Sequence, residues 1–223
     1  MHLRRHAVRL MILWAIVGIV VAAFALNGVR MNLLTKDVHQ LAKNWEAHED
    51  LPPYYGMLSN IGALIWCSAV AAMLFASFQL AGGVEASEAR KCLRWCALLT
   101  FLVMIDDFFM VHEYVFPRVL GLSERLPVAV YCIGFIAFFV RYAKFLRNNT
   151  HWQVLALAVG LLVVSEAADV TSTVGIDVED GFKIAGLIAY SYYWVHASWL
   201  LTTGAKTETA TQLVESSSCE RPT

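Results

Sequence analysis

The chain has 223 residues, of which 58% are hydrophobic and 16% are charged, and its mean hydropathy is +0.57. Soluble domains of this length are ordinarily about 45–50% apolar and about 25% charged, so the composition argues against a soluble or disordered chain and predicts a membrane protein. A net charge of −1 supplies no basic surface, so we expect no nucleic-acid partner.

Six apolar stretches are long enough to cross a hydrocarbon core of about 30 Å, which takes about 20 helical residues. The expected spans are residues 10–29, 57–84, 95–115, 126–145, 152–174 and 181–203. The first stretch exceeds the about 7–15 apolar residues of a signal peptide, which favours a retained helix. The sequence therefore predicts an all-α, polytopic domain over residues 1–205, a bundle of six transmembrane helices in the lipid bilayer.

The long connection before the second span carries helical periodicity. Apolar residues between Val38 and Trp45 recur at the spacing of one helix face, which predicts an amphipathic helix over residues 36–48. Two interpretations stay open. The helix lies at the membrane interface with Trp45 at headgroup depth, or it covers an outward-facing pocket as a lid.

The Lys and Arg residues of the short loops set the expected orientation. With a cytoplasmic N-terminus, most of the 17 Lys and Arg residues fall on the inner side, in clusters that include Arg4, Arg94 and Arg141. Both termini are therefore expected in the cytoplasm and the protein in the inner (plasma) membrane. Residues 206–223, rich in Thr, Ser and Glu, are expected to form a disordered cytoplasmic tail.

Acidic side chains interrupt the third expected span. On a continuous helix Asp106 and Glu113 lie about 20° apart on one face, Asp107 flanks that face, and His112 points elsewhere. A carboxylate at the centre of a membrane helix costs about 2.5–3.5 kcal/mol. These side chains must therefore face a polar cavity, pair with another group or bind a cation.

The fifth span carries a second acidic pair at a matching depth. Glu166 and Asp169 are three residues apart and hence on one side of a helix. We expect the third and fifth helices to present their carboxylates to one outward-facing cavity. Asp180 and Lys183, at the start of the sixth span, are expected at its rim, although helix capping and solvated charge explain the same segment.

Carboxylates together with an imidazole favour a divalent metal ion, and such an ion activates water in hydrolytic enzymes. The expected metal ligands are Asp106, Glu113, Glu166 and Asp169. His112 and Asp107 are the expected catalytic residues. The function expected first is thus a metal-dependent membrane enzyme that acts on a lipid or lipid-linked substrate.

Two other functions explain the same cluster. In a cation- or proton-coupled transporter or channel the carboxylates serve an ion pathway, around which a homo-oligomer would assemble. In an accessory or sensory membrane subunit the cluster holds helices together or senses the outer side. The chain contains no HExxH or comparable motif, so its sequence does not name a reaction.

Overall fold

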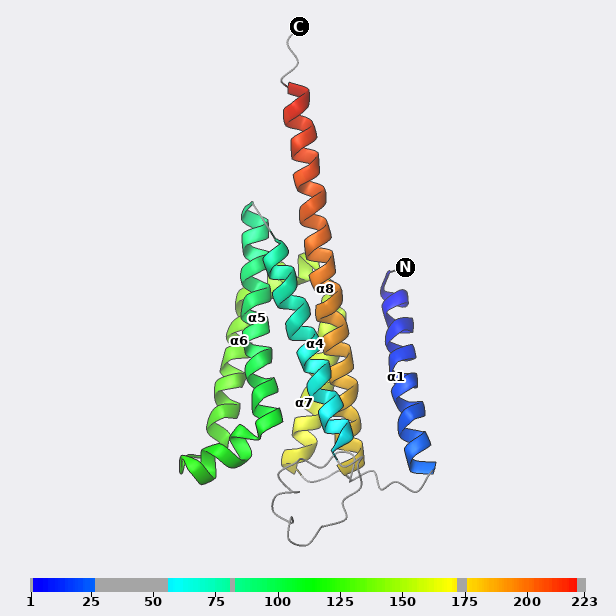
Figure 1. Ribbon diagram of the computed structural model, residues 1–223, viewed down its shortest axis with the longest axis vertical. Coiled ribbons are helices and arrows are strands. Elements are labelled where there is room, and N and C mark those ends of the chain that lie inside the picture. Colours follow the sequence, from blue (N-terminus) through cyan, green and yellow to red (C-terminus); the bar gives the residue numbers. More distant parts are fainter. Residues whose placement is uncertain (1, 27–55, 81–82, 172–175, 220–223) are drawn as a thin grey trace.

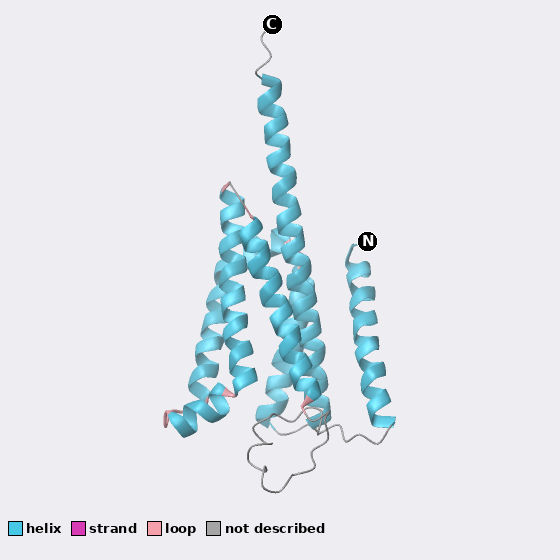
Figure 2. Ribbon diagram, in the orientation of Figure 1, coloured by secondary structure: helices cyan, strands magenta, loops and turns pink. Residues whose placement is uncertain are grey.

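The computed structural model describes residues 2–26, 56–80, 83–171 and 176–219. The regular structure in these residues is helical, which confirms the expected all-α fold for this part of the chain (Figure 2). The elements are α1 (His2–Leu26), α4 (Met57–Gln79), α5 (Val84–Phe109), η2 (Val111–Val119), α6 (Arg125–Asn149), α7 (Trp152–Thr171) and α8 (Ile176–Cys219). Successive α-helices run in opposite directions, so the start of α1 and the later part of α8 point to the same end (Figure 1).

Helix α8 is the central element of the bundle. It packs against α7 and α4, and α4 packs in turn against α5. Helix α6 joins the bundle through α5, whereas α1 contacts α8, where the indole of Trp14 donates a hydrogen bond of 3.2 Å to the carbonyl of Ala185. The largest fully buried side chains, Trp194, Met73 and Leu93, come from these packed helices. The core therefore lies around α8.

Small residues and buried hydroxyl groups bring the helices together. A Cβ atom on Gly186 of α8 would lie 2.8 Å from Cγ of Leu162 on α7, so these two helices approach closely because position 186 has no side chain. In the interior the hydroxyl oxygens of Tyr190 and Thr100 lie 2.7 Å apart and link α8 to α5. Cys96 joins the same group, with its Sγ atom 3.3 Å from the Tyr190 hydroxyl.

Two helices in the described part of the chain, α4 and α6, are long and apolar enough to cross a membrane by length and composition. The most apolar 18-residue stretch has a mean hydropathy of 2.0 in α4 and 1.8 in α6. Shorter apolar helical stretches lie at Ala7–Val20 and Trp152–Ala168. Each of the six expected spans overlaps a described helix, and two of these helices meet this criterion. The amphipathic helix expected over residues 36–48 lies outside the described residues.

The boundaries differ from the expected ones in two places. Helix α5 ends at Phe109, although the sequence predicts a span that continues to residue 115. Helix α8 continues to Cys219, where a disordered tail was expected from residue 206. The early end of α5 shapes the candidate site.

Candidate functional site

A break in the backbone separates α5 from η2. Met110 stands between them with φ 49° and ψ 49°, the left-handed conformation, which costs a residue with a side chain about 1–2 kcal/mol. The nine residues that follow form a π-helix, which contains Pro117. Strained backbone and π-helical turns are both concentrated at functional sites, so this junction is the first candidate.

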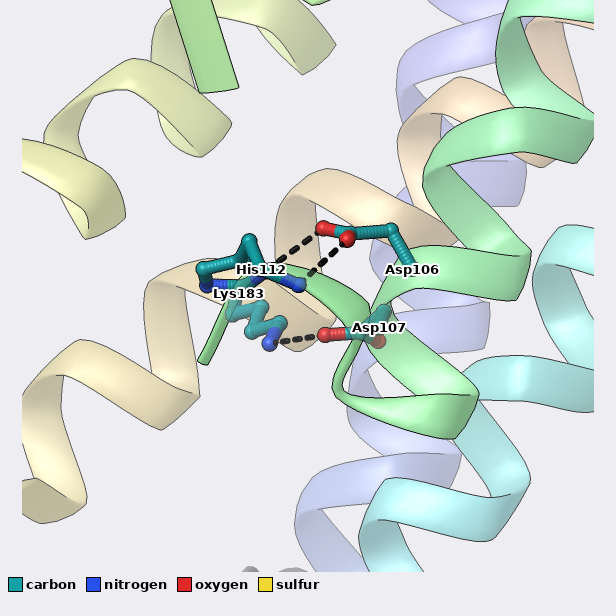
Figure 3. Close-up of polar contacts among 4 residues, drawn as sticks. All are labelled: Asp106, Asp107, His112 and Lys183. Carbon is teal, nitrogen blue, oxygen red and sulfur yellow. Dashed lines mark hydrogen bonds and ion pairs between the residues drawn. The ribbon is translucent and has the colours of Figure 1, made fainter. Parts of the chain in front are cut away.

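Asp106 and His112 meet across the break (Figure 3). Oδ2 of Asp106 lies 2.6 Å from Nδ1 of His112, and Oδ1 of the same carboxylate accepts the backbone N–H of His112 at 2.8 Å. The side chain of Asp106 is 7% exposed and that of His112 is 28% exposed. Both oxygens of the buried Asp106 carboxylate therefore contact His112. The bond to the backbone N–H also fixes the first turn of η2.

Asp107 turns to another element of the fold. Its Oδ1 atom accepts a hydrogen bond of 2.8 Å from Nζ of Lys183, which stands in the early part of α8 (Figure 3). The two side chains are partly exposed, 28% for Asp107 and 39% for Lys183. This ion pair attaches the end of α5 to α8 beside the Asp106–His112 pair.

The carboxylate of Asp106 determines which ring nitrogen of His112 exchanges protons. Because a carboxylate accepts hydrogen bonds, Nδ1 of a neutral imidazole carries its proton toward Asp106, and Nε2 becomes the basic nitrogen. Tyr131, on α6, lies near this carboxylate. The imidazole is therefore oriented by Asp106 before any substrate binds.

The structure corrects one expected relationship and leaves others outside its description. Asp106 and Glu113 do not share a helix face, because α5 ends at Phe109 and the left-handed residue redirects the chain. The sequence therefore missed the Asp106–His112 pair, whose members point apart on a continuous helix. The side chains of Glu113 and Asp169 lie outside the described ones.

The remaining expected site residues lie on α7 and α8. Glu166 is exposed on α7, while Asp180 is partly buried on α8, three residues before Lys183. Lys183 contacts Asp107, and its expected place at the rim of a cavity stays a prediction. Of the acidic pair of the fifth span, the described side chain is that of Glu166, which is exposed on the surface of the bundle.

In the part of the chain that the structure describes, no three His, Cys, Asp or Glu side chains gather into a group that holds a metal ion. Two of the four expected ligands, Glu113 and Asp169, are not among the described side chains, so the metal site stays a prediction. The geometry of the described pair is that of a histidine oriented by a carboxylate, an arrangement that serves metal ligation and general-base chemistry alike.

Comparison with known proteins gives one family. The family described as "Domain of unknown function (DUF8692)" matches residues 11–197, a range that contains Asp106, His112, Asp107 and Lys183. No curated protein matches the chain, and no solved structure matches it. The site must therefore be interpreted from its own geometry.

Proposed function

We propose that this chain, which belongs to the DUF8692 family, is a multi-pass membrane enzyme. Its His112 acts as a general base on a lipid or lipid-linked substrate. The observation that carries this proposal is the distance of 2.6 Å between the buried Asp106 carboxylate and Nδ1 of His112. Two supporting features are the strained residue Met110 and the π-helix that begins at the same place.

The exposed surface of the bundle supports the membrane location. Large apolar side chains face outward along α4 and α6, among them Phe78, which is 74% exposed, and Val140, which is 80% exposed. Continuous apolar surface of this kind is costly in water and favourable in a bilayer. All six α-helices would then span the inner (plasma) membrane, including those that carry charged residues near their ends.

The orientation follows from the positions of the basic residues. Arg94 in the first half of α5 and Arg141 in the second half of α6 belong to the end of the bundle at which α1 begins and toward which α8 runs (Figure 1). By the positive-inside rule this end is cytoplasmic, and the termini with it. The Asp106–His112 pair then lies toward the outer side.

The chemistry proposed for the site is proton abstraction. Nε2 of His112 takes a proton from water or from a substrate hydroxyl, and the Asp106 carboxylate stabilises the imidazolium that forms. Phe108 and Phe109, which are more than half exposed, lie in the chain between the two acidic residues and His112. In a bilayer these exposed rings would face the lipid, which supports a lipid or a lipid-linked molecule as the substrate class that reaches His112.

A divalent metal ion fits this proposal in one arrangement. His112 would be a ligand through Nε2, with Asp106 behind it as the residue that orients the ring. Bound metal is measured by mass spectrometry of the purified protein, with Asp106→Ala and Asp169→Ala for comparison. Loss of one metal ion per chain in both variants would place α5 and α7 around one ion. Unchanged metal content in both variants would mean that Asp106 and His112 act without a metal.

The enzyme is tested in nanodiscs that contain phosphatidylethanolamine, phosphatidylglycerol, cardiolipin and a polyprenyl diphosphate, each followed by mass spectrometry. We expect wild-type protein to convert one of these lipids, and His112→Gln and Asp106→Asn to lower the rate by a factor on the order of 10²–10⁴. Lys144→Gln, at an exposed position near the other end of α6, is the matched control. Folded wild-type protein that converts none of these lipids would refute the proposed enzymatic function.

A non-catalytic function has its own supporting observation. The two carboxylate contacts connect three elements, because Asp106 fixes η2 and Asp107 fixes α8. In an accessory or sensory subunit these contacts hold the helices or respond to conditions on the outer side. Such a subunit converts no lipid and carries no proton flux in liposomes, whereas a proton-coupled transporter or channel would show flux that Asp106→Asn abolishes.

A further inference from the structure

A second pair of chemically active side chains lies far from Asp106. His151, in the connection between α6 and α7, and His196, on α8, have ring centroids 5.6 Å apart with their planes at 43°. This pair lies at the end of the bundle where α7 begins, whereas η2 lies at the other end (Figure 1). The proposed enzyme site makes no use of either residue.

The separation of the two rings is suited to a shared ion. With a metal–nitrogen distance of about 2.0–2.1 Å, the centroid of a ligating imidazole lies about 3.2 Å from the ion. Two rings whose centroids are 5.6 Å apart then subtend an angle of about 120° at that ion. This angle is close to those of four-coordinate and three-coordinate metal sites.

Neighbouring contacts hold the backbone and the rings in position. The Thr150 hydroxyl, next to His151, donates to the carbonyl of Leu146 at 2.6 Å and lies 2.8 Å from the hydroxyl of Tyr193 on α8. The carbonyl of His151 accepts the N–H of Val154 at 3.0 Å, which fixes the first turn of α7. The connection between α6 and α7 is therefore attached to α8 within one turn of His196.

The ring of His196 is oriented separately. It stacks on Tyr192 with centroids 6.1 Å apart and planes at 21°, and Trp199 lies on its other side along the helix at 5.9 Å. Both histidines are partly exposed, so an ion from solution reaches them. Two imidazoles this close together form a chelating pair for borderline transition metals, of which Zn²⁺, Ni²⁺ and Cu²⁺ are typical.

We propose that His151 and His196 form a metal site, separate from the outer site, which binds one divalent transition-metal ion per chain. In the described residues no third His, Cys, Asp or Glu joins them, so water completes the coordination. The consequence is structural, because an ion held by both residues ties the connection between α6 and α7 to the centre of α8.

The test uses the full chain in detergent with its other histidines controlled. In a background in which His2, His6, His39 and His48 are changed to Gln, Zn²⁺ binding is titrated against a chromophoric chelator. We expect this background to bind one more Zn²⁺ per chain than the same background with His151→Gln or His196→Gln. The double variant should lose nothing more, because both residues serve one ion.

The matched control is His112→Gln in the same background, which should keep the Zn²⁺ and so separates this site from the proposed enzyme site. Equal binding in the background and in either single variant would overturn the proposal. Should a variant fail to fold, Cu²⁺ electron paramagnetic resonance of the folded background protein decides. Nitrogen couplings from two imidazoles support the shared site, and couplings from one or none refute it.

Discussion

His112 and Asp106 are joined by two contacts, one from the ring and one from the backbone. Nδ1 lies 2.6 Å from Oδ2 of Asp106, and the His112 N–H donates to Oδ1 at 2.8 Å. The carboxylate near the end of α5 thus accepts a backbone N–H at the start of η2 and orients the imidazole of the same residue. The site and the turn in the chain are consequently one structural feature, and a change at Asp106 affects both.

Asp106→Asn should reverse the tautomer of His112. The backbone N–H of His112 keeps the amide oxygen on its own side, so the amide NH₂ faces Nδ1 and donates to it. The ring proton then moves to Nε2, and the base needed for proton abstraction is lost. ¹⁵N NMR of histidine-labelled protein should show Nδ1 protonated in the wild type and Nε2 protonated in the variant.

Asp107→Asn serves as the control for that experiment. It removes the same charge one residue away but leaves both hydrogen bonds of His112 in place. The nitrogen shifts of His112 should keep the wild-type pattern. An identical pattern in wild type and Asp106→Asn would contradict the assigned tautomer.

The sequence predicted the helices well and the site only in part, for physical reasons. Long apolar runs indicate helices whatever their surroundings, whereas the end of α5 depends on Met110, a residue type with no preference for the left-handed conformation. On a continuous helix Asp106 shares a face with Glu113 and points away from His112, so the sequence predicted the wrong neighbour. The need of a buried carboxylate for a partner was predicted, but the partner was set by a turn that no local pattern encodes.

The ion pair between Asp107 and Lys183 should contribute modestly to stability. Both side chains are about a third exposed, so solvent screens their attraction. In a double-mutant cycle with Asp107→Asn and Lys183→Met we expect a coupling energy of about 1 kcal/mol or less, reduced at high salt. Unfolding in mixed micelles at low and high ionic strength measures it, and a coupling several times larger would indicate a dry, fully buried pair.

The hydroxyl pair in the core should show stronger coupling. Tyr190 is 2% exposed and Thr100 is fully buried, so removal of one hydroxyl leaves the other with only the weaker Cys96 thiol as a partner. Tyr190→Phe and Thr100→Val should each lower the free energy of unfolding by about 1–3 kcal/mol. The double variant should cost less than the sum of the two, and strict additivity would show that the hydroxyls do not depend on each other.

Gly186→Ala should destabilise the contact between α7 and α8. The new Cβ atom would lie 2.8 Å from Cγ of Leu162 and 3.1 Å from its backbone nitrogen, so the helices must separate. A cost of about 1–3 kcal/mol is expected from such overpacking. Gly160→Ala on α7 is the matched control, because a Cβ there meets nothing within 4 Å and helix propensity favours Ala by up to about 1 kcal/mol. Equal effects of the two substitutions would contradict this packing.

Met110 has a strained backbone conformation, which glycine would relieve. Its φ of 49° brings the Cβ atom close to the following carbonyl, a strain that glycine does not experience. Met110→Gly should therefore leave the free energy of unfolding unchanged or raise it by up to about 1 kcal/mol, since relief of strain opposes the greater freedom of glycine in the unfolded chain. Met110→Val should lower it by more than 1 kcal/mol, at the order of the cost of strained backbone, because a β-branched residue rarely adopts this conformation. Unfolding of both variants in mixed micelles, with the His112 nitrogen shifts as a check that the pair with Asp106 persists, measures the difference. A valine variant as stable as the glycine variant would show that the chain does not turn through a left-handed residue at this position.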